Sequence, residues 1–352
     1  MVKVYTDLTH YNPDQRYHLN SITKALWNDR TPEERDKVYG TWVRQFQLAA
    51  SPEEADVVLL AYKWVYYENY NLLGQAQKTA QQSQEQENPF IVFCEGDFPA
   101  HLPFDNAVLF ETAGYRSKTR FSYHSGLPFF LPDYRQLYCQ NSWQARRKTD
   151  RPMVGFCGLA GGSTLQLLTR RAANHGRQLA YHLGWRKSEP PPFETSSFRQ
   201  RVLGQLASSP GIDTSFILRK KYRAGVSGEK DPHHPSRLEF VGNILNSDYT
   251  VCMRGGGNFS VRFYETLSLG RIPLFIDTDC LLPWHDQIDY KAHFPWIEQH
   301  ELPHAGEKLL DFHHSLTDSD FIDLQHACRK LWEEQFTADG FYTRLAAQDF
   351  HV

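Results

Sequence analysis

Two arginines, a glycine triplet, a serine and a glutamate lie close together in residues 251–277, VCMRGGGNFSVRFYETLSLGRIPLFID. Glycines let a backbone approach an anion closely, and the first turn of a helix offers unpaired N–H groups at its positive end. Arg254 and Arg262 can add charge-assisted hydrogen bonds to a diphosphate, while Ser260 can cap the helix or bind a phosphate oxygen. Glu265 follows Arg262 on the same helical face, where it can accept hydrogen bonds from ribose hydroxyls. This spacing is typical of a nucleotide site.

Two standard nucleotide motifs nevertheless fail on this segment. The G-x-G-x-x-G pattern finds Gly255 and Gly257, but Ser260 stands where the third glycine belongs, and no G-K-[ST] lies nearby. A glycine run can also simply turn the chain from strand to helix, and Arg262 with Glu265 could form an exposed ion pair. The residues alone therefore leave a nucleotide site and a structural turn both open.

The pattern of apolar and polar segments around these residues predicts an α/β fold with two halves. Short apolar runs predict buried strands, and polar stretches such as 72–87 favour helices between them. The expected strands cover residues 2–5, 55–62, 89–94, 106–111, 153–158, 214–222, 249–253 and 272–277. One helix is expected from residue 164 to Gly176, which would end it. A second helix, with apolar residues along one face, is expected over 320–336. Strands that alternate with helices predict parallel sheets covered on both faces.

A polar and basic stretch at 140–152 separates the two halves. It lacks apolar periodicity, so we place the domain boundary there. The sequence thus predicts an N-terminal Rossmann-like acceptor domain over 1–145, a C-terminal Rossmann-like donor domain over 146–320, and a C-terminal helical segment over 321–352.

Composition and charge argue against several functional classes. The chain has 352 residues, a formal net charge of −3 and no basic block longer than RKK at 219–221, so no nucleic-acid partner is expected. Its six cysteines stand singly, without the C-x-x-C spacing of a zinc or redox site, and are expected to be small buried residues in a reducing compartment. The N-terminus resembles a strand more than a leader, and no apolar window reaches the roughly 18 residues of a membrane span. We expect a cytoplasmic protein whose membrane contact, if any, is peripheral.

Metal binding is the other chemistry that the sequence invites. The aspartates of DTD at 277–279 could chelate Mn²⁺ or Mg²⁺, but they follow the strand after the nucleotide helix, where loop solvation or acceptor contact is the better interpretation. The sixteen histidines form no H-x-x-x-H or H-E-x-x-H pattern. We therefore expect no metal and no cofactor.

The run SDYTVCMRGGGNFSVRFYETLSLGRIPLFIDTDCLLPW closely resembles the signature of the exostosin family of glycosyltransferases, glycosyltransferase family 47. That signature has a C-x-R-G strand, an S-x-R-x-x-E helix, a G-x-I-P turn and a distal L-P, all present here in order. Upstream, ASPEEADVVLLAY at 50–62 resembles the P-E-x-A-D that precedes a strand in the family's N-terminal half.

The resemblance implies a GT-B fold: two Rossmann-like domains face each other across a cleft, and the C-terminal one holds a nucleotide-sugar. The C-terminal helix is a candidate to cross back to the N-terminal domain. The resemblance also implies transfer with inversion and without a metal. By motif, Arg254, Gly255, Ser260, Arg262 and Glu265 match the family's donor site.

Further donor contacts are expected beside that motif. Gly256 belongs to the same anion-binding turn, and a metal-free reaction needs fixed positive charge for the departing nucleoside diphosphate. Arg219, Lys220 and Lys221, at an expected strand end in the same domain, are the next candidates to supply it. A retaining enzyme of this fold would often carry a glutamate eight residues before Glu265, where Gly257 stands.

An inverting transfer also needs a base that removes the proton of the acceptor hydroxyl. The carboxyl ends of the N-terminal strands offer Asp7, Glu95 and Asp97, and Glu111. We prefer Asp97 and Glu95, because a glycine between two carboxylates directly after a buried strand makes a tight, exposed turn. Each of these residues could instead be a helix cap or turn former.

The sequence therefore predicts an inverting, metal-independent glycosyltransferase that moves a sugar from a nucleotide-sugar, expected to be a UDP-sugar, to a glycan or glycolipid acceptor in polysaccharide biosynthesis. The alternative is a binding protein that keeps the donor site without catalysis. A metal-dependent enzyme that uses DTD is a third hypothesis. The sugar, the acceptor and the oligomeric state are not predicted.

Overall fold

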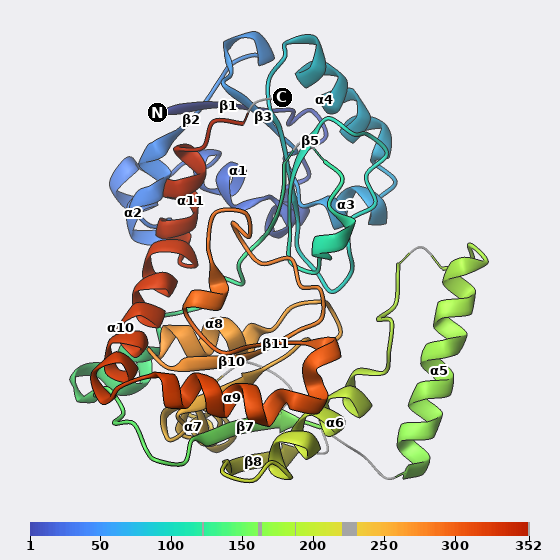
Figure 1. Ribbon diagram of the computed structural model, residues 1–352. Coiled ribbons are helices and arrows are strands. Elements are labelled where there is room, and N and C mark those ends of the chain that lie inside the picture. The colour runs from blue at the N-terminus through green and yellow to red at the C-terminus, as the bar shows by residue number, and fades with distance from the viewer. Residues whose placement is uncertain (122, 161–163, 187, 220–230, 351–352) are drawn as a thin grey trace. The chain divides into compact units, whose positions relative to one another are not determined.

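The computed structural model describes residues 1–121, 123–160, 164–186, 188–219 and 231–350 (Figure 1). The chain divides into two compact units. Unit 1 comprises Met1–Phe130, Cys280–Gln287 and Glu334–Val352, and unit 2 comprises Leu131–Asp279 and Ile288–Glu333.

Unit 1 is built on a sheet with the strand order β2-β1-β3-β4-β5-β6, and every pairing between these strands is parallel. Its strands are β1 (Val2–Thr6), β2 (Phe46–Leu48), β3 (Val57–Leu59), β4 (Phe90–Cys94), β5 (Ala107–Glu111) and β6 (Tyr123–Gly126). Its helices are α1 (Ser21–Leu26), α2 (Pro32–Tyr39), α3 (Trp64–Asn69), α4 (Leu73–Glu85) and α11 (Ala338–Ala346). All residues of β4 and β5 are buried, as expected of parallel strands covered on both faces.

Unit 2 has a second parallel sheet, with the strand order β11-β10-β9-β7-β8. Its strands are β7 (Met153–Leu159), β8 (Asp213–Arg219), β9 (Tyr249–Cys252), β10 (Ile272–Asp277) and β11 (Trp296–Glu298). Its helices are α5 (Thr164–His182), α6 (Thr195–Ala207), α7 (Pro235–Leu245), α8 (Val261–Ser268), α9 (Ala305–Ser315) and α10 (Asp318–Gln335). Two Rossmann-like units on parallel sheets confirm the predicted α/β fold class of GT-B proteins.

The C-terminal segment contributes to both units, because α10 lies in unit 2 up to Glu333 and α11 lies in unit 1. Within unit 1, the Asp339 carboxylate of α11 accepts hydrogen bonds from Thr41 Oγ1 and Trp42 N at 3.1 and 2.9 Å. The rings of Trp42 and Tyr342 stack at 4.3 Å between centroids. The C-terminal helical segment therefore does return to the N-terminal half.

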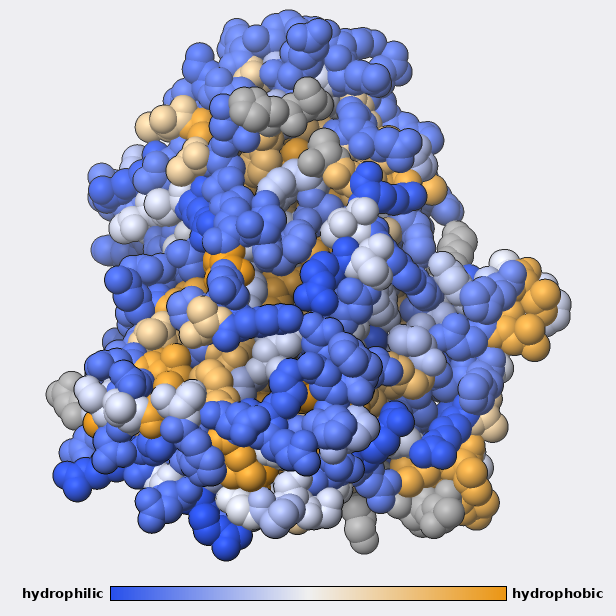
Figure 2. Space-filling view, in the orientation of Figure 1, coloured by the Kyte–Doolittle hydropathy of each residue, from blue (hydrophilic) through white to orange (hydrophobic). Residues whose placement is uncertain are grey.

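Helix α5 differs from its predicted extent. It continues past Gly176 to His182, because apolar residues keep their helical spacing through Leu179 and a helical glycine costs only about 1 kcal/mol. Gly184, with φ of 74°, turns the chain after it. Figure 1 draws α5 at the right, and Figure 2 shows apolar side chains at the upper and lower ends of that side of the molecule. None of the described helices combines the length and the apolarity that crossing a bilayer requires.

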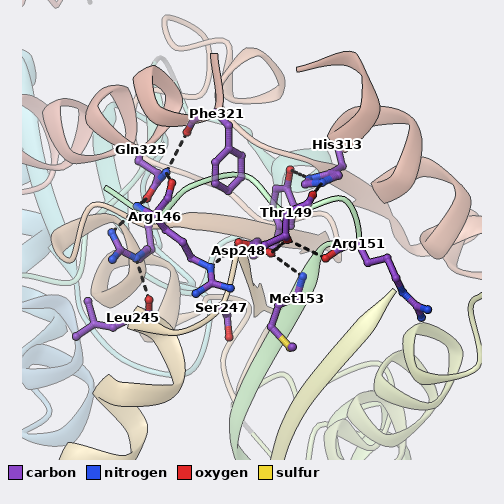
Figure 3. A network of polar contacts seen from close by, with 12 residues as sticks. Arg146, Thr149, Arg151, Met153, Leu245, Ser247, Asp248, His313, Phe321 and Gln325 are labelled. Atoms are coloured by element: carbon purple, nitrogen blue, oxygen red, sulfur yellow. Dashed lines mark hydrogen bonds and ion pairs between the residues drawn. The ribbon is translucent and has the colours of Figure 1, made fainter. Parts of the chain in front are cut away.

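The stretch around 140–152, expected to be the domain boundary, is bonded into unit 2 (Figure 3). The buried Asp248 carboxylate, just before β9, accepts hydrogen bonds from Arg146 Nε, Thr149 Oγ1 and Met153 N at 2.5, 2.7 and 2.7 Å. Gln325 of α10 also bonds both backbone groups of Arg146. The compact units divide after Phe130 rather than near 145, because these polar residues find partners inside unit 2.

Candidate nucleotide site

The sheet of unit 2 contains one position where the direction of chain crossover reverses. Strands β8 and β9 lie on opposite sides of β7. In open parallel sheets, ligands bind outside the carboxyl ends of the strands at such a position. We call the carboxyl ends of β7 and β9 the switch edge. The glycine run and helix α8 follow β9 directly and so begin at this edge.

Arg262, in the first turn of α8, spans the switch edge. Its Nη2 donates to the carbonyl of Cys157 at 2.8 Å and its Nη1 to that of Val251 at 3.4 Å, which joins the ends of β7 and β9. The guanidinium carbon lies 4.1 Å from the centre of the Phe156 ring. A side chain at Gly158 would come within 2.7 Å of Nη2, so glycine there leaves the room that Arg262 needs.

The charge of Arg262 is not neutralised within the protein. Among the residues that the structure describes, no carboxylate forms an ion pair with it, and its buried Nε has no hydrogen-bond partner. Burial lowers the pKa of this guanidinium below its ordinary value. A partly buried cation without a counterion among the described residues, at the carboxyl ends of parallel strands, could attract an anion.

A second arginine, Arg199 of α6, crosses the same edge. Its Nη1 donates to the carbonyl of Leu159 at 3.0 Å and its Nη2 to that of Arg254 at 2.9 Å. The predicted donor residue Arg254 is buried, and its Nη2 donates to the Gly256 carbonyl at 3.3 Å. Gly255 N donates to Phe259 O at 3.1 Å, which closes the turn before α8. The predicted glycine turn and both predicted arginines therefore lie together at the switch edge.

Ser260, expected either to cap the helix or to bind a phosphate oxygen, is the N-cap residue of α8, but its side chain makes no capping hydrogen bond. Helix N-termini need partners for their first N–H groups, and serine usually supplies one. An uncommitted hydroxyl at this N-terminus leaves both the hydroxyl and the helix dipole for a ligand oxygen.

Glu265 is buried one turn further along α8, where it does not pair with Arg262. Its Oε1 accepts hydrogen bonds from Tyr134 Oη at 3.1 Å and from Arg237 Nη1 at 2.9 Å. Arg237 Nη2 also donates to Tyr134 Oη at 2.9 Å, which closes a three-membered network. Burial and the nearby Glu265 carboxylate raise the pKa of Tyr134 above its ordinary value, so its hydroxyl remains a donor. The carboxylate is thus held in one orientation.

The basic cluster after β8 is engaged differently. Arg219 Nη2 donates to Glu239 Oε2 at 2.6 Å and to the Ser236 carbonyl at 2.7 Å. Lys220 and Lys221 lie outside the described residues. Arg219 therefore already has a carboxylate partner, unlike Arg262.

In unit 1 the carboxylates predicted as bases follow three different strands. Asp7 comes directly after β1, at the position where β2 and β3 flank β1 on opposite sides. Its Oδ1 accepts hydrogen bonds from Thr9 N and Thr9 Oγ1 at 2.9 and 2.6 Å. Burial alone would raise the pKa of Asp7, but the Thr9 hydrogen bonds, together with His10 and Lys78, outweigh it and hold this pKa below its ordinary value.

Glu95 and Asp97 follow β4 in a turn that Thr112 fixes. Thr112 Oγ1 accepts from Gly96 N at 3.0 Å and donates to Gly96 O at 2.6 Å. Glu95 Oε2 pairs with Lys63 Nζ at 2.6 Å, whereas the exposed Asp97 has no polar partner among the described residues. Glu111, the remaining candidate, is buried and bonded to His124 Nε2 at 2.7 Å.

Comparison with known proteins finds weak similarity to several glycosyltransferases. No family model matches it. It is 28% identical to Exostosin-1 of Drosophila melanogaster over 112 residues, which are 31% of this chain and only 14% of that protein. Among solved structures it is similar to a glycosyltransferase from Rickettsia africae ESF-5, with 9% identity, a TM-score of 0.35 and coverage of 98% of this chain and 97% of that one. WaaG, described as a glycosyltransferase involved in lipopolysaccharide biosynthesis, gives 12% identity, a TM-score of 0.29 and 98% coverage of each chain.

Sequence reasoning missed His10, which lies four residues after β1 and close enough to Asp7 for that carboxylate to raise its pKa. Burial has the larger effect and lowers the pKa of His10, so the ring favours its neutral form. Its Nε2 lies 3.1 Å from Tyr67 Oη, and its buried Nδ1 has no hydrogen-bond partner among the described residues. The only available signal was its position after the first buried strand.

The DTD segment is tied into the fold of unit 2. Thr278 Oγ1 donates to Asn258 Oδ1 at 2.7 Å, and Asn258 Nδ2 donates to the Asp279 carbonyl at 3.0 Å. The described part of the chain contains no group of three or more His, Cys, Asp or Glu residues that could hold a metal ion. All six cysteines are buried and unpaired.

Proposed function

We propose that the protein is an inverting, metal-independent glycosyltransferase of the exostosin type. It would transfer a sugar from a nucleotide-sugar, with UDP-sugars as the first donor class to test, to a glycan or glycolipid acceptor. The observation that carries this proposal is the cation of Arg262 at the switch edge, which no carboxylate of the described chain neutralises.

The donor-site residues support separate tasks. Arg262 and Arg254 would bind the diphosphate, with Gly255, Gly256 and Ser260 offering backbone and hydroxyl contacts at the start of α8. Glu265, whose Oε1 already accepts from Arg237 and Tyr134, would accept ribose hydroxyls at its other oxygen. Arg219, with Lys220 nearby in sequence, would contribute charge at longer range because Glu239 already pairs with it.

In the proposed reaction, the acceptor hydroxyl oxygen attacks the anomeric carbon while a base removes its proton. The bond from that carbon to the β-phosphate oxygen breaks, and the nucleoside diphosphate leaves with both electrons. Fixed cations at the switch edge would stabilise this charge as it develops, which is the role that a divalent metal performs in other transferases.

We propose that unit 1 supplies the base, with Asp97 ahead of Glu95 and Asp7. Asp97 has no polar partner among the described residues, Glu95 is paired with Lys63, and the pKa of Asp7 is lowered. A carboxylate already stabilised as an anion accepts a proton less readily. Asp97→Asn should reduce turnover by about 100-fold or more while donor binding is kept. If Asp97→Asn and Glu95→Gln both keep full turnover, the assignment is wrong, and Asp7→Asn and His10→Gln become the next variants.

A thermal-shift panel of UDP-, GDP-, dTDP- and CMP-sugars tests the donor proposal directly. One class should raise the unfolding temperature by a few degrees, because a ligand at 100 times its Kd stabilises by about 2.7 kcal/mol. Adding candidate acceptors and measuring release of the nucleoside diphosphate then separates an enzyme from a binding protein, since a binder releases none. Activity lost with EDTA and restored by Mn²⁺ would contradict metal independence.

A further inference from the structure

Helix α5 carries a face of leucines on its solvent side. Leu165, Leu168, Leu179 and Leu183 expose 72%, 55%, 60% and 50% of their surface, and Trp185 just beyond exposes 80%. With Ala172 and Gly176, the leucines recur every three or four residues, so they form one stripe along the helix. Figure 2 shows apolar side chains near both ends of α5.

The opposite, polar face is the one that contacts the protein. Asn174 Nδ2 donates to the Pro191 carbonyl at 3.1 Å, and Gln178 Nε2 donates to the Pro190 and Pro191 carbonyls at 3.0 and 2.6 Å. Arg171 Nε donates to Ser197 Oγ at 3.1 Å. A surface helix of a globular protein normally buries its apolar stripe and exposes its polar one. In α5 this arrangement is reversed.

The charge of the segment points to what covers the apolar face. Residues 151–188 contain no aspartate or glutamate, although the whole chain has a net charge of −3. The stretch 164–187 carries four arginines and a lysine. A second copy of this chain, packed face to face, would bring these like charges together. An anionic surface would neutralise them.

We propose that α5 lies on the surface of an anionic membrane, with its leucine stripe among the acyl chains and its arginines among the lipid phosphates. An exposed leucine stripe, arginines outside that stripe and a tryptophan just beyond the helix are features of helices that lie in the plane of a bilayer interface. At about 1.5 Å per residue, its 19 residues would form a contact about 28 Å long. The surface uses none of the proposed donor residues and stands independently of the proposed reaction.

Co-sedimentation of the full chain with vesicles tests this proposal. The protein should bind vesicles of equimolar phosphatidylcholine and phosphatidylglycerol, bind phosphatidylcholine alone weakly, and lose binding as salt is raised. The double variant L168S/L179S should lower partitioning by about tenfold or more. Leu238→Ser on α7, where the leucine is also exposed, is the matched control and should bind like the unsubstituted protein.

The proposal is overturned if the protein does not co-sediment with anionic vesicles, or if L168S/L179S binds them as strongly as the unsubstituted protein does. It is also overturned if light scattering detects a dimer that the same double variant abolishes, because the stripe would then belong to a second copy. Thermal unfolding and the nucleotide-sugar shift without vesicles should be unchanged in the variant, so failure here is distinguishable from failure of the donor proposal.

Discussion

Replacing Arg262 with methionine should remove donor binding without destabilising the protein. If Arg262 binds the diphosphate as proposed, the substitution removes charge-assisted hydrogen bonds whose loss costs about 2–4 kcal/mol. That corresponds to an increase of about 30- to 700-fold in the Kd for the nucleotide-sugar. A thermal-shift signal of a few degrees at a fixed donor concentration should therefore disappear.

The free energy of unfolding should change much less than donor binding. Losing the hydrogen bonds of Arg262 destabilises the protein, whereas removing its charge stabilises it. Methionine loses the hydrogen bonds to the Cys157 and Val251 carbonyls, which contribute about 1 kcal/mol each. It also removes a guanidinium that no carboxylate of the described chain neutralises, and it can keep contact with the Phe156 ring. The free energy of unfolding should change by no more than about 1 kcal/mol.

Arg271 offers a matched control in the same sheet. It lies just before β10, at the amino ends of the strands, whereas Arg262 lies at their carboxyl ends. Its guanidinium donates to the carbonyls of Leu245, Gly270 and Gln144 and to Gln325 Oε1, at 3.1 to 3.3 Å. Burial lowers the pKa of Arg271 to about 10. Arg271→Met leaves four acceptors without this donor, so it should lower the free energy of unfolding by about 3 kcal/mol while the donor shift persists.

Urea unfolding with and without the donor measures both quantities for the two variants. The reasoning is refuted if Arg262→Met keeps the full donor-induced stabilisation. It is equally refuted if Arg262→Met loses as much stability as Arg271→Met, because Arg262 would then be a structural residue like its control.

Three further outcomes test how the units are held together internally. Asp248→Ala should lower the free energy of unfolding by about 3 kcal/mol in urea titrations, because it removes a buried carboxylate with three donors, whereas Asp248→Asn should lose less. Burial lowers the pKa of His313, whose Nδ1 lies 2.9 Å from Tyr249 Oη, so the unfolded chain binds the extra proton more readily. The contribution of neutral His313 to the free energy of unfolding is therefore fully present above about pH 6.5 and is lost as the pH falls below that value. His313→Phe should make stability depend less on pH in this range. A methyl group at Gly126 would clash with the Leu281 carbonyl oxygen, so Gly126→Ala should destabilise the protein by about 2 kcal/mol or more. Gly204 lies in an open part of α6, so Gly204→Ala should stabilise by up to about 1 kcal/mol, and thermal unfolding measures both changes.

The strands that the sequence predicted best are those with strong apolar runs. Strands β4, β5, β9 and β10 consist entirely of buried residues, and a parallel sheet covered on both faces requires that composition. Strands β2 and β11 have three residues each, which is too short for a periodic signal. The end of α5 was predicted wrongly at Gly176. This glycine lies inside the helix with open space beside it, so it does not force the chain to turn.

Long-range partners could not be predicted in the same way. Glu265 is 28 residues from Arg237 and 131 residues from Tyr134 in sequence. These three residues meet because α7, which carries Arg237, and the first residues of unit 2, which carry Tyr134, both pack against α8. Arg199 is 55 residues from Arg254, on a helix whose sequence carries no nucleotide motif. Local spacing identified which residues begin α8, but the fold decided which groups orient them.

Arg219 and Arg262 illustrate the same limit for charge. Both are arginines beside the ends of unit 2 strands, and the sequence assigned both to the diphosphate. Arg219 lies within 2.6 Å of the Glu239 carboxylate, so an anionic ligand there would have to compete with an existing ion pair. Arg262 donates only to neutral carbonyls among its described partners, so a ligand phosphate would supply its first counterion. The difference in available charge, rather than the presence of an arginine, is why donor binding should depend more strongly on Arg262 than on Arg219.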